Sequence, residues 1–121
     1  MILMRKFLIA AAIAASFPVT AKAAPVKTTP TDDLNCAIWA AQVSGNSDDP
    51  EVANGFGLVM TWFIGRWEGA TGKNFEDGMT PQYISSITPK MDQIGDACLT
   101  RMKDFGGRMS AWGNSLQESG H

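Results

Sequence analysis

The sequence has little of what enzymes commonly use for catalysis. Its single histidine, His121, is the last of 121 residues, and cysteine occurs only twice. A Ser-His-Asp triad, a histidine dyad and a histidine-rich metal site are therefore excluded. No Gly-x-x-x-x-Gly-Lys-Ser/Thr phosphate loop is present. Adjacent acidic residues occur at Asp32-Asp33, Asp48-Asp49 and Glu76-Asp77. Roles in helix capping and solubility explain them better than a role as the catalytic carboxylates of a glycosidase. We expect a protein that is not an enzyme and has no metal or cofactor.

The sequence also lacks any alternating polar–apolar segment long enough to predict a strand. Apolar residues instead recur at steps of three and four, which is typical of amphipathic helices. The fold class that we expect is all-α, a small bundle of four to five helices in one domain over residues 32–118.

One long apolar run lies at the N-terminus. Arg5 and Lys6 precede an apolar stretch over residues 7–17, and Ala21-Lys22-Ala23 follows. This order is typical of a secretory signal peptide, and the run is shorter than the roughly 20 residues that span a bilayer. We predict a cleaved signal peptide over residues 1–23, a flexible arm over residues 24–31 and a periplasmic location. An uncleaved N-terminal anchor is the alternative. No later stretch is long enough for a membrane span.

The charge of the exported chain differs from that of the precursor. Removal of three basic residues leaves 7 Lys and Arg against 12 Asp and Glu, a formal charge of −5. An acidic chain is a poor partner for nucleic acid. We therefore expect a protein partner or unfolded protein clients instead.

The two cysteines, Cys36 and Cys98, are 62 positions apart. Export places them in an oxidising compartment, so we predict a disulfide. A metal pair and a reactive thiol are the alternatives, but two sulfurs with one terminal histidine make a poor zinc site. Closing so long a loop would stabilise a small domain by about 4 kcal/mol in the chain-entropy model.

The stretch from Asp49 to Gly72 is expected to organise the fold. Asp49-Pro50 is a helix start signal, glycine ends the stretch, and one apolar stripe lies between them. We expect the rest of the chain to cover this stripe, with Arg66 and Glu68 pointing outward. Its members are Val52, Phe56, Val59, Met60, Phe63, Ile64 and Trp67.

The remaining elements follow from the same periodicity. The expected order is a helix over 33–43 after an N-cap within residues 31–33, a loop over 44–48, a loop over 72–78, a helix over 80–87, a break at 88, and a last helix over 89–116. The last helix has a sustained apolar stripe, and Gly106-Gly107 is expected to split or bend it. Its stripe comprises Met91, Ile94, Cys98, Met102, Phe105, Met109, Trp112 and Leu116.

Gly65 and Gly69 lie four residues apart in the organising helix, hence on one side of it. Each glycine lowers helix stability by up to about 1 kcal/mol relative to alanine. Close approach of a neighbouring helix backbone would explain them, and a helix weak enough to open under stress is the alternative.

Tryptophan and methionine are abundant for so small a domain. They either fill the core or form an adaptable apolar surface, since methionine packs against varied shapes. The candidate surface for a client or partner comprises Trp62, Phe63, Trp67, Met102, Met109 and Trp112.

Several short motifs lie within residues 34–115 of this exported helical domain with two joined cysteines: Leu34-Asn35-Cys36, Thr88-Pro89, Asp96-Ala97-Cys98, Phe105 and Trp112. In these features the chain resembles the HdeA/HdeB family of periplasmic acid-stress chaperones. The chain departs from that family in its higher glycine content, the longer interval between its cysteines and fewer C-terminal lysines.

The resemblance implies a holdase that forms a homodimer at neutral pH and exposes apolar surface to unfolded clients in acid. The alternative function is a non-enzymatic periplasmic binding module, such as an inhibitor or immunity protein.

Overall fold

The computed structural model describes residues 27–120. The predicted signal peptide and residues 24–26 of the predicted arm lie outside this range. The described chain is all-helical and contains no strand, which confirms the expected fold class. Its elements are α1 (Pro30–Asn46), α2 (Pro50–Thr71), α3 (Phe75–Gly78), α4 (Pro81–Ile87), the 3-10 turn η2 (Thr88–Lys90) and α5 (Met91–Glu118).

The first helix begins earlier than predicted. Thr29 is its N-cap: the Thr29 hydroxyl accepts the Asp32 N–H, and the Asp32 carboxylate accepts the Thr29 N–H. Pro30 then fits the first turn, where a missing N–H leaves no hydrogen bond unmade. The predicted cap within residues 31–33 and the predicted end of the arm at residue 31 are therefore wrong by two residues or more.

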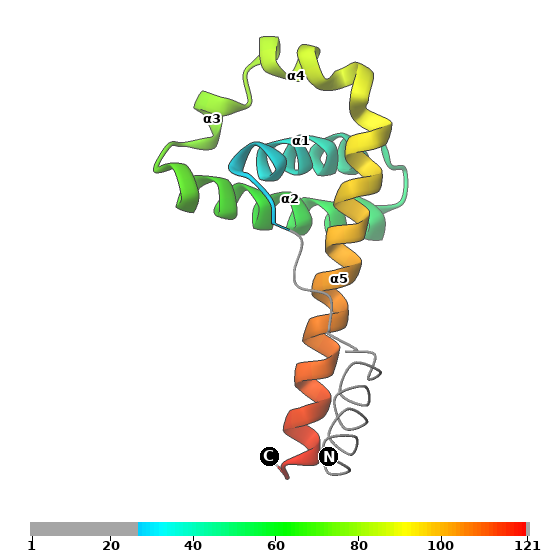
Figure 1. Ribbon diagram of the computed structural model, residues 1–121. Coiled ribbons are helices and arrows are strands. Elements are labelled where there is room, and N and C mark those ends of the chain that lie inside the picture. The colour runs from blue at the N-terminus through cyan, green and yellow to red at the C-terminus, as the bar shows by residue number, and fades with distance from the viewer. Residues whose placement is uncertain (1–26, 121) are drawn as a thin grey trace, which may run out of the picture.

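The predicted organising helix is confirmed as α2. Asp49 caps its start by accepting the Glu51 N–H, and Gly72 ends it with a φ of 70°, where glycine avoids the strain of a side chain. A three-residue connection turns α1 back along α2, so that the two helices form an antiparallel pair (Figure 1). The Ser44 hydroxyl donates to the Ala53 carbonyl at 2.7 Å and joins the helices near this turn.

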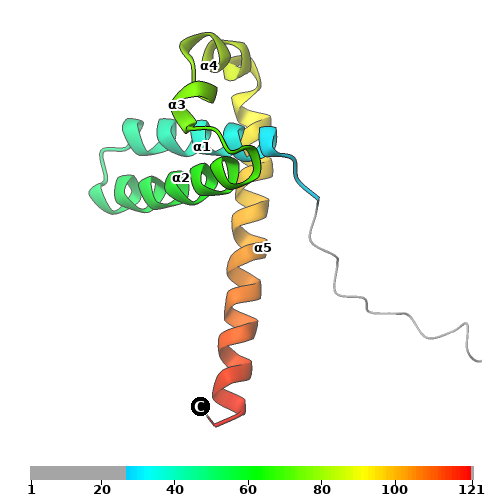
Figure 2. The same cartoon turned by 90° about the vertical axis from the view of Figure 1, so that its left-hand side faces the viewer.

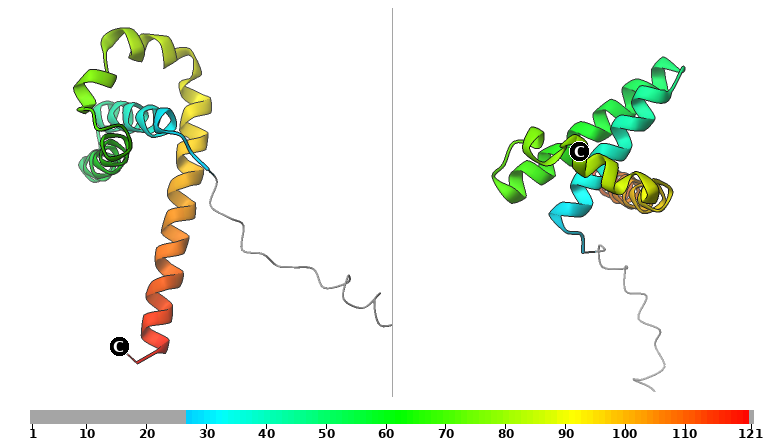
Figure 3. Two further views of the ribbon diagram at one scale, coloured as in Figure 1. Left: turned by 60° about the vertical axis from the view of Figure 1, so that its left-hand side comes forward. Right: turned by 90° about the horizontal axis from the view of Figure 1, so that it is seen from above.

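The centre of the fold is α1, however, and not α2. Figure 3 shows α1 with α2, α4 and α5 around it. In α2 only Phe63 and Trp67 are buried, because one side of that helix faces solvent. Val52, at the start of the predicted stripe, is exposed. The buried residues of α1 are Asp33, Leu34, Cys36, Ala37, Ile38, Trp39 and Ala40.

A glycine does leave room for a neighbouring helix, but at a position that the sequence analysis did not single out, and the room is taken by a side chain. A Cβ atom on Gly95 of α5 would lie 2.6 Å from Nε1 of Trp39 on α1. The predicted reason for Gly65 and Gly69 is wrong, because a Cβ on either would meet nothing within 4 Å.

The chain between α2 and α5 is more helical than predicted. The expected loop over residues 72–78 contains the single turn α3, whose Phe75 N–H donates to the Glu68 carboxylate at 2.9 Å. The predicted helix over 80–87 is confirmed as α4, and η2 lies at the predicted break. The predicted split of the last helix at residues 106–107 is wrong, because α5 continues through both glycines. One glycine pair weakens a long helix without removing its hydrogen bonds.

The long helix α5 crosses the α1–α2 pair steeply, and its C-terminal half extends beyond it (Figures 1 and 2). Only the N-terminal half of α5 therefore takes part in the core.

Candidate binding surface

The N-terminal half of α5 is attached to α1 by a covalent bond. Cys36 and Cys98 form the predicted disulfide, with their Cα atoms 5.6 Å apart. Both cysteines are buried in a cluster with Trp39 and Phe63. The disulfide therefore fixes the point from which the rest of α5 extends.

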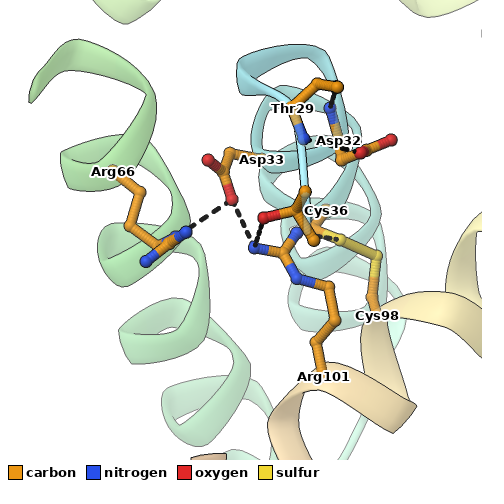
Figure 4. Close-up of polar contacts among 8 residues, drawn as sticks. Thr29, Asp32, Asp33, Cys36, Arg66, Cys98 and Arg101 are labelled. Carbon is orange, nitrogen blue, oxygen red and sulfur yellow. Dashed lines mark hydrogen bonds and ion pairs between the residues drawn. A yellow bond between two sulfur atoms is a disulfide. The ribbon is translucent and has the colours of Figure 1, made fainter. Parts of the chain in front are cut away.

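A cluster of three charged side chains joins α1, α2 and α5 beside the disulfide (Figure 4). Asp33 is buried, and its Oδ1 atom accepts from Arg66 Nε at 3.1 Å and also from Arg101 Nη2. The Arg101 guanidinium lies 4.9 Å from the centre of the Phe63 ring, a cation–π distance. Removing one member of such a buried pair leaves an uncompensated charge, so this cluster fixes the position of the helices.

Beyond this attachment the apolar stripe of α5 continues, and after Phe105 no element of the described chain covers it. Phe105, Met109, Trp112 and Leu116, which we call the α5 face, are 37%, 56%, 66% and 37% exposed. Steps of four, three and four residues place them on one side of the helix. Figure 2 shows no other helix of the described chain beside this half of α5. A row of large exposed apolar side chains of this kind is typical of an interaction site.

The α5 face continues into a small apolar groove where α5 leaves the core. The Phe105 ring stacks on the Trp62 ring of α2 with centres 4.9 Å apart. Leu58, one turn before Trp62, is 74% exposed. The groove has a volume of about 260 Å³ and is lined by Leu58, Val59, Trp62, Met102, Phe105 and Gly106. It extends the apolar surface from α5 onto α2.

The structure separates the residues predicted as a candidate surface into three groups. Met109 and Trp112 are exposed on the α5 face, whereas Trp62 and Met102 are partly buried and line the groove. Phe63 and Trp67 are buried in the core, because the side of α2 that carries them faces α1. For these two residues, the predicted surface role does not hold in the folded protein.

Phe105, Leu116 and Leu58 are additions to the predicted surface. The first two belong to the predicted stripe of α5, so the signal was present in the sequence. Leu58 lies outside the α2 stripe, and because single exposed leucines are common on protein surfaces, no sequence signal identifies it. The Asp33 cluster was missed because an aspartate near a helix start has the ordinary interpretation of a cap.

No group of three or more His, Cys, Asp or Glu side chains in residues 27–120 is placed to hold a metal ion. Over the same range, no helix combines the length and apolar character needed to cross a membrane. The arrangement can present an apolar helix face to a protein.

Comparison of the sequence with protein-family models, with curated proteins and with solved structures finds no match.

Proposed function

We propose that this chain is a non-enzymatic, exported protein that binds unfolded protein clients through the α5 face, as a periplasmic holdase. The observation that supports this function is the row of exposed apolar side chains on the half of α5 that extends beyond the core. The disulfide suits an oxidising compartment and fixes the base of that helix.

The chemistry of the α5 face suits clients without a fixed shape. Methionine adapts to irregular partners, while phenylalanine and tryptophan supply large apolar area. Gly106 and Gly113 lie beside Phe105 and Trp112, and a Cβ on either glycine would meet nothing within 4 Å. An incoming segment can therefore approach the helix backbone closely at the edge of the α5 face.

Acid is the proposed condition for this activity. Near neutral pH, 12 carboxylates outweigh 7 basic side chains downstream of residue 23. Carboxyl groups as a class titrate near pH 4, so at about pH 2 the basic groups are left without balance. The resulting repulsion favours loosening, which would add Phe63 and Trp67 to the exposed apolar surface.

The test compares two substitutions that introduce the same side chain on opposite sides of α5. Trp112→Gln alters the α5 face, whereas Asn114→Gln alters an exposed position away from it. Light scattering of an aggregating client is followed at about pH 2–3, where most carboxyl groups are protonated. We expect protection by the wild type and by Asn114→Gln, and weaker protection by Trp112→Gln. Equal protection by all three would refute a role of the α5 face.

A second candidate function is the binding of one folded partner, as an inhibitor or immunity protein does. The α5 face is exposed in the folded protein, and the disulfide and the Asp33 cluster fix its base, so no loosening is needed. Near-UV circular dichroism that stays unchanged down to about pH 2, together with absent client protection, would favour this candidate.

The α5 face could instead bind the α5 face of a second copy of the chain and so form a homodimer. Sedimentation at neutral pH tests it. A dimer that Trp112→Gln dissociates and Asn114→Gln leaves intact would place the subunit contact on the α5 face.

A further inference from the structure

The basic side chains of this acidic protein are concentrated in one cleft. Five of the seven Lys and Arg residues downstream of residue 23 line it, against only two of the twelve acids, Asp32 and Asp104. The cleft has a volume of about 1050 Å³ and lies between the start of α1, α2, α4 and α5. Its basic residues are Lys27, Arg66, Lys90, Arg101 and Arg108.

The Asp33 cluster borders this cleft and carries an excess positive charge. Two guanidinium groups share the Oδ1 atom of one carboxylate, so the three side chains together are formally +1 (Figure 4). The Arg101 side chain is only 13% exposed. Its Nη1 atom contacts Cys36 Sγ, a weak acceptor, at 3.5 Å, and its Nη2 atom also donates to Thr28 Oγ1 at 3.4 Å. Arg66 donates to the protein only through Nε within residues 27–120. Guanidinium hydrogens therefore remain for a second acceptor.

We propose that this cleft binds a ligand through an oxyanion head group, a carboxylate or a phosphate, held by Arg66 and Arg101. Guanidinium groups match the two oxygens of such anions, and charge-assisted hydrogen bonds of this kind are strong. Partial burial of Arg101 strengthens the attraction relative to open solvent. Asp32 and Asp104 reduce the positive field of the cleft without balancing its five basic groups. This cleft adjoins the α5 face, because Phe105 and Trp62 also line it.

The test measures anion binding by the full exported chain with its disulfide intact. Acetate, inorganic phosphate or decanoate replaces chloride at constant ionic strength, and both the thermal midpoint and the heat of binding are recorded. We expect at least one anion to raise the midpoint in proportion to the logarithm of its concentration. If only phosphate raises the midpoint, the head group of the ligand is a phosphate. If acetate and decanoate both raise it, the head group is a carboxylate. If only decanoate raises it, the ligand is a carboxylate on an alkyl chain.

Two substitutions that each remove one positive charge are compared for their effect on anion binding. Arg66→Gln removes a proposed anion contact, whereas Lys73→Gln removes an exposed basic residue that does not line the cleft. We expect Lys73→Gln to retain the wild-type affinity and Arg66→Gln to raise the Kd about tenfold or more, as loss of a charged hydrogen bond does. Equal midpoint shifts in all three proteins would show a general salt effect and overturn the proposal.

Asp33→Asn provides a second test, which remains informative if Arg66→Gln does not fold. It leaves two guanidinium groups without their carboxylate, so an anion in the cleft should stabilise this variant more than the wild type. No larger gain in the thermal midpoint of Asp33→Asn than in that of the wild type would contradict the proposed site.

Discussion

Phe63 is the largest of the fully buried side chains, and its environment predicts a high cost of truncation. Its ring packs against Trp62 and lies under the Arg101 guanidinium. We expect Phe63→Ala to lower the free energy of unfolding by roughly 3–5 kcal/mol, because a cavity is left between three helices. Leu58→Ala, at a largely exposed position of the same helix, should change it by about 0.5 kcal/mol or less. Urea unfolding measures both, and a loss below about 1 kcal/mol for Phe63→Ala would contradict its place in the core.

Tyr83 contributes a stabilisation that is lost at alkaline pH. Burial, and then the charge of Asp32, raises the pKa of Tyr83 above the usual 10.0. The unfolded chain therefore releases this proton at lower pH than the folded protein. The resulting stabilisation is complete below about pH 10 and is lost as pH rises through the folded-state pKa.

Comparison with Tyr83→Phe isolates this contribution. The variant lacks the hydrogen bond that the Tyr83 hydroxyl donates to Asn35, so it should be less stable at neutral pH, by about 1 kcal/mol. We expect the difference from the wild type to shrink above about pH 10, as measured by urea unfolding at several pH values. If the difference in the free energy of unfolding stays constant across that pH range, folding does not shift the pKa of Tyr83.

Single residues are where the sequence was least informative. Asp33 follows Asp32 and has the same side chain, yet Asp32 completes a cap while Asp33 is buried between two arginines. The difference arises from their positions around α1, and those depend on a helix start that was predicted too late. Arg66 and Arg101 are 35 positions apart, so no local pattern joins them.

At the scale of elements, the glycines of α5 have opposite roles in its two halves. A Cβ on Gly106 or Gly107 would meet nothing, so alanine there should raise the free energy of unfolding by up to about 1 kcal/mol each. Gly95→Ala should destabilise instead, because its Cβ would collide with Trp39. Thermal unfolding of the three variants shows whether each alanine stabilises or destabilises the protein. Stabilisation by Gly95→Ala would show that α5 does not approach α1 so closely.

The helices themselves followed well from periodicity and start signals, as α2 and α4 show. Periodicity did not reveal where α5 leaves the core. The apolar steps are alike before and after Met102, but the first half packs on α1 and the second half is exposed. An apolar stripe requires a partner surface, and the sequence does not state whether that surface belongs to the same chain.

At the scale of the whole molecule, the disulfide closes a loop between positions 62 residues apart and joins the first helix to the last. We expect Cys36→Ser or Cys98→Ser to lower the free energy of unfolding by about 4 kcal/mol or somewhat less. The double substitution should cost about as much as either alone, because the single bond is already absent. Two free thiols in the unfolded, unreduced wild type would contradict the bond itself.

The central claim is that the C-terminal half of α5 is a formed helix that holds clients on its apolar side. Hydrogen exchange with and without a reduced, unfolded client, such as α-lactalbumin, tests this claim most directly. We predict that at about pH 2–3 the client slows amide exchange over residues 105–118 more than over the disulfide-linked core of residues 34–40. Slowed exchange confined to other segments, or no change at any segment while the client stays bound, would contradict the claim.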